Sequence, residues 1–504
     1  MFKIEIEEIP ITTEISMEKQ KIGAEPAESF KKIHYSLIIF MIIQVLWLLA
    51  FSEPLTLLVN QGQPLIPILS DDIISRTARY VMIYHSLAVP FLVANTFWIL
   101  EFYPVRKRWI PTLKVLLLPG TYLVGISGLI FAYTRIRVFH EIFYFGLFMV
   151  FLGGIIFIIS VFPIPGKFPD PRTNPSGSTI NRINLEYMNL VILAICVMVS
   201  TIMAAIAALE NFTGTIWGLG REPEAFLAEA IIRRHPHDVV EDFIVSHLHI
   251  QLAQSAAMVL MVGYRTSKMS GKAYTYTLIA NAIGVIVISY GSWVLDHYTI
   301  WVGAGILIIC TLALAIVGWK KLIRDNLKER YATTTRWGKI KGLFKDPVNF
   351  TYFYLILFSH IFVTITGIIV GLQVDSFYRL QETLELEYDF NVGHWHVLSV
   401  LIAIVLMLKS IDFFNISGKQ RKILGWGYLI GSTLAFSGAD IYMLRPLPAE
   451  NVQPGLTIMF TGVWFLIISV IWAIIAITKK YRRELSEKKL SKLLILERAQ
   501  EIKP

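Results

Sequence analysis

Two histidines separated by one residue, His394 and His396, stand near the start of an apolar stretch of the chain. In a helix, residues two apart lie roughly 200° from each other around the axis, on nearly opposite faces. Each imidazole can therefore serve a different metal-containing group. Relaying protons, binding a substrate and hydrogen bonding to a neighbouring helix are the other roles of polar residues inside a membrane.

More histidines lie near the ends of other apolar stretches. His85 lies near the start of the apolar stretch 79–101, and His247 and His249 lie near the start of the stretch 241–263. His297 follows the end of the stretch 272–294. Because neutral imidazole is the commonest protein ligand for metals, these positions are candidate ligands.

The elements that must position these histidines are membrane-spanning helices. The chain has 504 residues, of which 55% are hydrophobic and only 16% charged, and this composition excludes a soluble globular protein. We expect an all-α polytopic membrane protein, because apolar runs long enough to cross a hydrocarbon core of about 30 Å recur along the chain. The predicted fold is a twelve-transmembrane-helix bundle, with spans near 34–55, 79–101, 110–133, 141–163, 187–208, 241–263, 272–294, 298–318, 348–372, 391–409, 421–443 and 455–478.

Lysine and arginine gather in the connections on one side of the predicted membrane. These basic segments are 106–108, 265–272, 320–345, 419–422 and 479–483. The positive-inside rule places them in the cytoplasm, together with both tails, 1–33 and 479–504, that flank one membrane domain at 34–478. These segments also account for the formal net charge of +9, which therefore requires no nucleic-acid partner.

This orientation places the six histidines named above near the outer face of the membrane. Six imidazoles from four spans at one depth favour ligation of metals, because ligation requires neutral imidazoles that converge at one level. Core packing is the alternative.

The order of these residues resembles the catalytic subunit of the heme-copper oxidase and nitric oxide reductase superfamily, over about residues 30–480. His247-Leu-His249-Ile-Gln251 is similar to His-Leu-Trp-Val-Glu of nitric oxide reductases, more than to His-Pro-Glu-Val-Tyr of common oxygen reductases. Asp296-His297-Tyr298-Thr-Ile-Trp301-Val-Gly303 resembles the reductase motif His-His-Tyr-Phe-Trp-Ile-Gly, with one extra residue. The resemblance implies a cytochrome c oxidase subunit I-like fold in the cell membrane.

The resemblance also implies the cofactors, two b-type or variant hemes and one non-heme metal, iron or copper. His85 and His396 would be the axial ligands of a low-spin heme that receives electrons. His394 would hold a high-spin heme with an open sixth position, and His247 and His297 would hold the non-heme metal. An open iron that faces a second metal can bind a small gaseous substrate, nitric oxide or oxygen.

The chain departs from the family pattern at two positions. Gln251 stands where reductases carry a glutamate; it shares a helix face with His247 and offers an amide oxygen without negative charge. Asp296 stands where the family has the first of two adjacent histidines. The ligand set of the second metal therefore stays open, with oxygen donors favouring iron. His249 is either an outer-shell partner or a substitute ligand, and His360 is either a core hydrogen-bonding residue or a pocket residue.

Tyr290 lies about two helical turns before His297. Oxygen reductases of this superfamily use a tyrosine beside the copper, so Tyr290 supports oxygen reduction as an alternative, while a tyrosine at the membrane interface is the simpler interpretation. The same span carries a polar stripe that either guides protons or joins helices. The stripe consists of Thr277, Asn281, Ser289 and Ser292.

The expected function is reduction of nitric oxide to nitrous oxide by a respiratory reductase. A terminal oxygen reductase is the first alternative, and a non-catalytic heme b electron carrier or a transporter is the second. The only cysteines, Cys196 and Cys310, lie in predicted spans, so there is no covalent heme-attachment motif and no dicysteine copper centre. The electron donor is therefore expected to be a quinol or a partner subunit with a cytochrome or cupredoxin domain.

Overall fold

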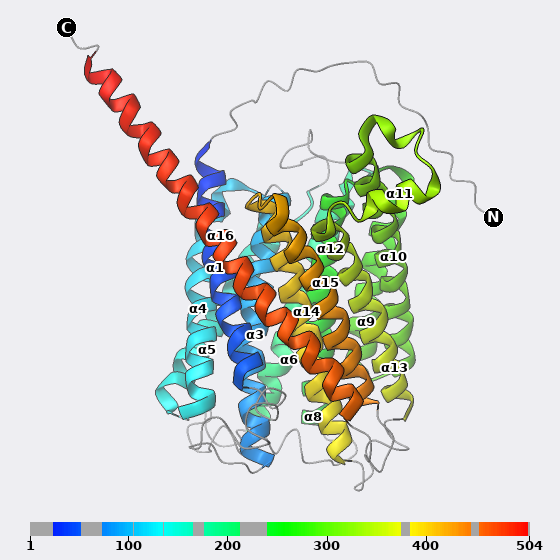
Figure 1. Ribbon diagram of the computed structural model, residues 1–504. Coiled ribbons are helices and arrows are strands. Elements are labelled where there is room, and N and C mark those ends of the chain that lie inside the picture. The colour runs from blue at the N-terminus through cyan, green and yellow to red at the C-terminus, as the bar shows by residue number, and fades with distance from the viewer. Residues whose placement is uncertain are drawn as a thin grey trace.

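The computed structural model describes residues 24–51, 73–103, 105–134, 136–164, 176–211, 239–373, 384–444 and 453–501. These residues are mostly helical, and the long helices lie side by side in one bundle (Figure 1). Within the described ranges, eight helices are long and apolar enough to cross a membrane. The chain is therefore an all-α, multi-pass membrane protein, which confirms this part of the prediction.

The long helices follow one another in three consecutive groups, and each helix packs against the next member of its group. The first group consists of α1 (Ala24–Phe51), α3 (Ile73–Phe102), α4 (Ile110–Thr134) and α5 (Arg137–Val161). The second consists of α6 (Leu185–Asn211), α8 (Val239–Ser267), α9 (Gly271–Trp293) and α10 (His297–Leu327). The third consists of α12 (Pro347–Phe358), continued by the π-helix η5 (Ser359–Val363) and by α13 (Thr364–Gln373), then α14 (Leu384–Phe413), α15 (Gly418–Met443) and α16 (Gln453–Glu501).

The connections contain short elements. They are η1 (Lys107–Trp109), η4 (Lys328–Tyr331), α11 (Arg336–Leu343) and the antiparallel strands β1 (Thr179–Ile180) and β2 (Ile183–Asn184).

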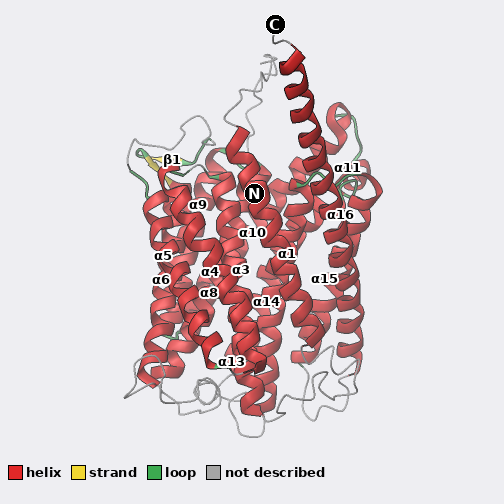
Figure 2. Cartoon of the chain, turned by 90° about the vertical axis from the view of Figure 1, so that its left-hand side faces the viewer, coloured by secondary structure: helices red, strands yellow, loops and turns green. Residues whose placement is uncertain are grey.

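The long helices run side by side along the bundle (Figures 1 and 2). Their contacts close the three groups into a ring, with one helix of each group on the inside. Neighbouring groups meet where α5 contacts α6, where α10 contacts α12, and where α16 contacts α1. The second helix of each group, α3, α8 or α14, contacts the other two. These three inner helices carry the candidate ligands His85, His247, His394 and His396.

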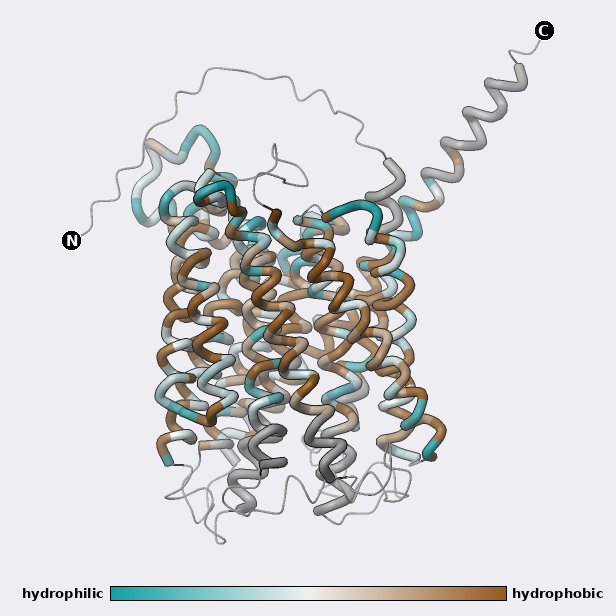
Figure 3. The backbone as a smooth tube through the Cα atoms, turned by 180° about the vertical axis from the view of Figure 1, so that it is seen from behind, coloured by the Kyte–Doolittle hydropathy of each residue, from teal (hydrophilic) through white to brown (hydrophobic). Residues whose placement is uncertain are grey.

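Apolar side chains cover the mid-length of the bundle, and hydrophilic residues gather at the end where α11 lies (Figure 3). On the outside of the bundle, large hydrophobic side chains such as Phe148, Val302 and Ile468 are more than half exposed. An exposed apolar belt of this kind matches a lipid environment, because the hydrocarbon core accepts apolar side chains and excludes unpaired polar groups.

Glycines allow α15 and α16 to approach each other closely. A Cβ atom added at Gly462 would lie 2.1 Å from the backbone nitrogen of Ala435, and one at Gly438 would lie 2.3 Å from the backbone nitrogen of Met459. Small residues at such contacts let two membrane helices pack backbone against backbone.

An ion cluster joins α12, α14 and α15 at the α11 end of the bundle. The Arg421 guanidinium donates to both carboxylate oxygens of Asp346, at 2.9 and 2.8 Å, and to Asp412 Oδ1 at 2.9 Å. Asp346 also caps α12 by accepting from the backbone nitrogen of Asn349. Because bidentate Arg–carboxylate pairs have strict geometry, this cluster aligns Asp346 and Asp412 at one depth.

The predicted C-terminal tail begins as a continuation of the last helix. α16 runs on to Glu501, well beyond the predicted span that ends near residue 478, and it projects from the bundle (Figure 1). No proline or glycine interrupts this segment, and an i,i+4 ion pair between Arg483 and Glu487 at 2.8 Å supports the extension.

Candidate functional site

The inner helices α3 and α8 bring His85 and His247 together. Their ring centroids lie 6.0 Å apart and the ring planes differ by 10°. The resemblance assigns these residues to two different centres, a low-spin heme and a second metal. The structure therefore places side by side the rings of two residues that the resemblance assigns to different centres.

Hydrogen bonds to α6 fix the chemistry of His247. Its Nδ1 lies 2.9 Å from the carbonyl oxygen of Ser200, and because a carbonyl oxygen only accepts, Nδ1 carries the proton and donates. The Ser200 hydroxyl donates to the His247 carbonyl oxygen at 3.0 Å and also lies 3.0 Å from Nδ1. A neutral His247 therefore keeps its lone pair on Nε2, as in metal-binding histidines whose other nitrogen donates to a carbonyl.

Gln251 lies one turn after His247 and also contacts α6. Its amide nitrogen donates to the carbonyl oxygen of Val197 at 3.3 Å and to the Thr201 hydroxyl at 3.2 Å. With the nitrogen engaged, the amide oxygen is the Gln251 atom that can bind a metal. Sequence reasoning missed Ser200 and Thr201, because small hydroxyl residues in an apolar span carry no distinctive signal.

Asp296 acts as the N-cap of α10. Its two carboxylate oxygens accept from the backbone nitrogens of Tyr298 at 3.2 Å and Thr299 at 3.3 Å, and also from the Thr299 hydroxyl. The Thr299 hydroxyl is the main cause that lowers the pKa of Asp296, with the backbone donors adding to it. The Asp296 carboxylate therefore has a helix-capping role.

His297 begins α10 and lies against α13. A Cβ atom added at Gly371 would lie 3.2 Å from His297 Cδ2 and within 3.7 Å of Trp301. The ring thus occupies the interface between α10 and α13 at the end of the bundle where α8 begins.

The remaining candidate residues are either exposed or outside the part of the chain whose side chains the structure describes. Tyr290 is 57% exposed on α9, and His249 is exposed on α8. His394 and His396 belong to α14, but their side chains lie outside the described residues. Among the side chains that the structure does describe, no three His, Cys, Asp or Glu residues form a group that could hold a metal ion.

His360 lies in the π-helix η5 and is 7% exposed. Its Nδ1 lies 2.8 Å from the carbonyl oxygen of Ile356, so Nδ1 donates and a neutral ring keeps its lone pair on Nε2. That Nε2 is buried and has no hydrogen-bond partner among the described residues.

The polar stripe of α9 joins this helix to α6 and α8. Asn281 donates to Asn189 at 2.9 Å, and Ser289 accepts from Gln254 at 2.8 Å. The Thr277 hydroxyl instead donates to the Ala273 carbonyl oxygen within its own helix. These contacts support the helix-joining interpretation and also place polar atoms where α6, α8 and α9 meet.

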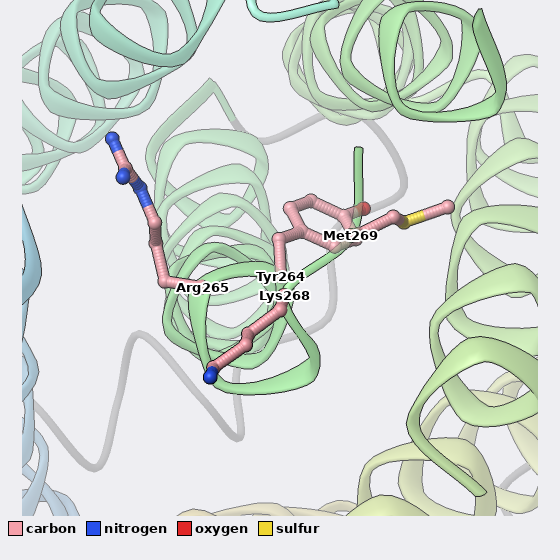
Figure 4. Close-up of a pocket in the computed structure, with 4 residues that line it drawn as sticks. All are labelled: Tyr264, Arg265, Lys268 and Met269. Atoms are coloured by element: carbon pink, nitrogen blue, oxygen red, sulfur yellow. The ribbon is translucent and has the colours of Figure 1, made fainter. Parts of the chain in front are cut away.

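A buried ion pair closes this interface at the α11 end of the bundle. Arg265 donates to the fully buried Glu186 at 2.6 Å, and the Tyr274 hydroxyl donates to the same carboxylate at 2.5 Å. Arg265 also lines a pocket with Tyr264, Lys268 and Met269 (Figure 4). In this view Arg265 points to one side, and Tyr264 and Met269 point to the other. Sequence reasoning did not single out Glu186, although a carboxylate at the edge of a predicted span was a usable signal.

No protein-family model matches the chain, and no curated protein matches it.

Proposed function

We propose that the chain is the catalytic subunit of a membrane-bound respiratory reductase that converts nitric oxide to nitrous oxide. In this proposal the fold is a twelve-helix bundle like that of the heme-copper oxidase superfamily. The cofactors are two b-type hemes and one non-heme metal.

One observation carries the proposal: the histidine-bearing helices α3, α8 and α14 are the three inner helices of the ring. His85 lies 12 residues after the start of α3, His247 lies 8 after the start of α8, and His396 lies 12 after the start of α14. At a rise of about 1.5 Å per residue, these distances from the helix starts differ by about 6 Å, which is about one turn. Three mutually packed helices with histidines at one depth suit a buried metal centre.

The fit of His247 to a metal rests on its hydrogen bonds. With Nδ1–H donated to the Ser200 carbonyl, Nε2 is the nitrogen that would hold the non-heme metal, together with His297 and Gln251. His85, His394 and His396 would hold the hemes. Once bound, the metals would pass on the donor's electrons and offer the open coordination position for the gas.

Nitric oxide is favoured over oxygen by the position of Tyr290. A tyrosine that supplies an electron and a proton beside a buried metal must itself be buried, and Tyr290 is 57% exposed. Nitric oxide reduction needs no such residue: two nitric oxide molecules, two electrons and two protons give nitrous oxide and water.

The location follows from charge. The α11 end carries the basic connection 328–345, so we place that end in the cytoplasm and the candidate metal centre near the outer face of the cell membrane. Electrons would come from a quinol or from a partner subunit with a cytochrome or cupredoxin domain.

The test is the optical spectrum of the purified full-length protein, reduced, with and without carbon monoxide, together with iron and copper analysis and a nitrous oxide assay. We expect a low-spin heme, a second heme that binds carbon monoxide, and nitrous oxide formation. His247→Ala should abolish turnover, whereas His34→Ala, at a buried histidine stacked on Trp98 at 4.0 Å, should retain it.

Three results would contradict the proposal. Oxygen consumption without nitrous oxide formation would indicate a terminal oxygen reductase. A heme indifferent to carbon monoxide would indicate an electron carrier, and a colourless protein would indicate a transporter.

A further inference from the structure

The third group of helices contains an interruption at His360. α12 and α13 form one continuous element except for the five residues of η5, which adopt a π-helix. Single turns of π-helix inside α-helices are rare and occur frequently at functional sites, because they rotate one side chain out of the regular register. His360 is the titratable residue inside this turn.

The His360 ring presents a lone pair with no partner in the described part of the chain. Nδ1–H donates to Ile356 O at 2.8 Å, and the Ser359 hydroxyl lies 3.3 Å from the same nitrogen. Both contacts involve the ring edge that faces its own helix, so the opposite nitrogen, Nε2, is directed away from that helix. Its surroundings are buried, because the residue is 7% exposed.

His360 lies at the depth of the histidines on α14. The Arg421 cluster aligns Asp346 of α12 with Asp412 at the end of α14. His360 follows Asp346 by 14 residues and His396 precedes Asp412 by 16, so both lie about 21–24 Å from this cluster at 1.5 Å per residue. The π-helix also contacts α14 directly.

From these observations we infer that His360 Nε2 is a ligand of a transition metal bound beside α14. The inference rests on the proposed function, because it requires a metal at this depth. A neutral imidazole whose Nδ1–H is held by a backbone carbonyl has the tautomer and the fixed orientation that metal-ligating histidines use. The metal is the non-heme ion, because in the proposed function His85 and His396 fill both axial positions of the low-spin heme and the sixth position of the high-spin heme is left for the gas.

The test compares the wild-type protein with His360→Gly, which removes the imidazole, and with His360→Gln, which keeps a polar side chain without the ring. The readouts are heme per protein from the optical spectrum, total iron and copper, and the high-spin and low-spin signals in electron paramagnetic resonance. We expect His360→Gly to lower the occupancy of the non-heme metal at least about tenfold with the hemes retained, and added imidazole to reverse the change. His360→Gln should show the same defect.

The readout separates the non-heme ion from heme. Loss of iron or copper with the heme retained would support the inference, whereas loss of heme absorbance together with iron would overturn it.

The matched control is His34→Gly with and without imidazole. His34 is also buried and its Nε2 also lacks a partner among the described residues, but it is packed between Trp98 and Phe413 at the opposite end of α1 from the candidate metal centre. This variant should keep the wild-type spectrum and metal content.

Wild-type metal content and spectrum in both His360 variants would overturn the inference and leave the proposed function intact. A change in His360→Gly that imidazole does not reverse, with a wild-type spectrum in His360→Gln, would also overturn it, because the ring would then be needed only for packing. A wild-type protein without heme or metal would overturn both proposals together.

Discussion

His247 shows how one side chain can be prepared for chemistry by its neighbours. The Ser200 carbonyl oxygen accepts the Nδ1–H at 2.9 Å, and the Ser200 hydroxyl bridges to the His247 backbone at 3.0 Å. These contacts hold the ring in one tautomer and one orientation beside His85. Outer-shell contacts of this kind tune the affinity of a histidine for metal, so their removal has a measurable effect.

Ser200→Ala should lower the affinity for the non-heme metal, and with it nitric oxide turnover, by about tenfold, the smaller end of outer-shell effects, because the backbone carbonyl remains. Metal titration and nitrous oxide formation check this result. Ser160→Ala is the control, since that buried hydroxyl donates only to Phe157 in its own helix at 2.7 Å. Equal effects of the two substitutions would show that Ser200 contributes to packing alone.

Tyr290→Phe should leave the rate of nitric oxide reduction within about twofold of wild type, because exposed positions tolerate substitution. The side chain is 57% exposed, whereas a residue that takes part in a buried reaction must itself be buried. Nitric oxide and oxygen consumption by the purified variant are the measurements. A large loss of oxygen reduction in the variant would instead favour the oxygen reductase alternative.

The helices are joined by two kinds of contact, glycine-mediated packing and ion pairs at the α11 end. α15 and α16 approach through Gly438 and Gly462, whereas α12, α14 and α15 are joined by Arg421. The glycine contact depends on the absence of a side chain, so an added methyl group should disrupt it. The ion cluster depends on charge, so a neutral substitution or a lower pH should weaken it.

Gly462→Ala should destabilise the protein by roughly 1–3 kcal/mol, because the added Cβ would overlap the backbone of α15. The nearest atom, Ala435 N, lies 2.1 Å from the Cβ position. Gly305→Ala is the matched control, since nothing lies within 4 Å of its Cβ position. Thermal unfolding of the two purified variants should separate them, and equal melting temperatures would refute the close helix contact.

The Asp346 cluster should make stability depend on pH. Burial alone would raise the pKa of Asp346, but the hydrogen bonds and charge of Arg421 outweigh it and lower the pKa below its ordinary value. A carboxylate with a lowered folded-state pKa contributes stability above its unfolded pKa of about 3.9, and the contribution is lost as the pH falls through the folded-state value.

Asp346→Asn should therefore lower the free energy of unfolding by roughly 1–3 kcal/mol at pH 7, and the difference from wild type should shrink below about pH 4. Melting temperatures at pH 7, 5 and 3 measure this. Asp325→Asn, which removes an exposed i,i+4 pair with Lys321, should have an effect below about 0.5 kcal/mol. A difference between Asp346→Asn and wild type that does not change with pH would contradict the electrostatic account.

In the whole molecule, the two ends of the helix bundle differ in charge and in their distance from the candidate ligands. α1 begins and α16 ends at the end where α11 lies (Figure 1), and that end carries the basic connection between α10 and α12. The inner helices start from the opposite end, so the candidate ligands lie nearer to that side. The proposed orientation of the protein follows from this separation.

Single cysteines introduced at exposed positions test the orientation. An impermeant thiol reagent added outside intact cells should label Arg137→Cys, at the start of α5, and should not label Arg336→Cys in α11. The native Cys310 is buried and Cys196 is half-buried, so neither should react. The reverse labelling pattern would invert the topology and move the candidate metal centre to the cytoplasmic side.

The amino-acid sequence by itself determined that this is a helical, multi-pass membrane protein, because a membrane span is a local property of about twenty consecutive apolar residues. It also identified the histidines as candidate ligands, because their positions along each predicted span can be read from the sequence. The placement of His394 and His396 near the outer face stays a prediction, because their side chains lie outside the described residues.

The tertiary structure decided which of these residues meet. Pairing depends on how each helix is rotated and which helix it packs against, and these are set by contacts between distant segments. For this reason the proximity of His85 and His247, the support from Ser200, the capping role of Asp296 and the π-turn at His360 were not predictable from spacing. The exposure of Tyr290 was equally a matter of helix rotation, because each residue of a span can face either lipid or protein.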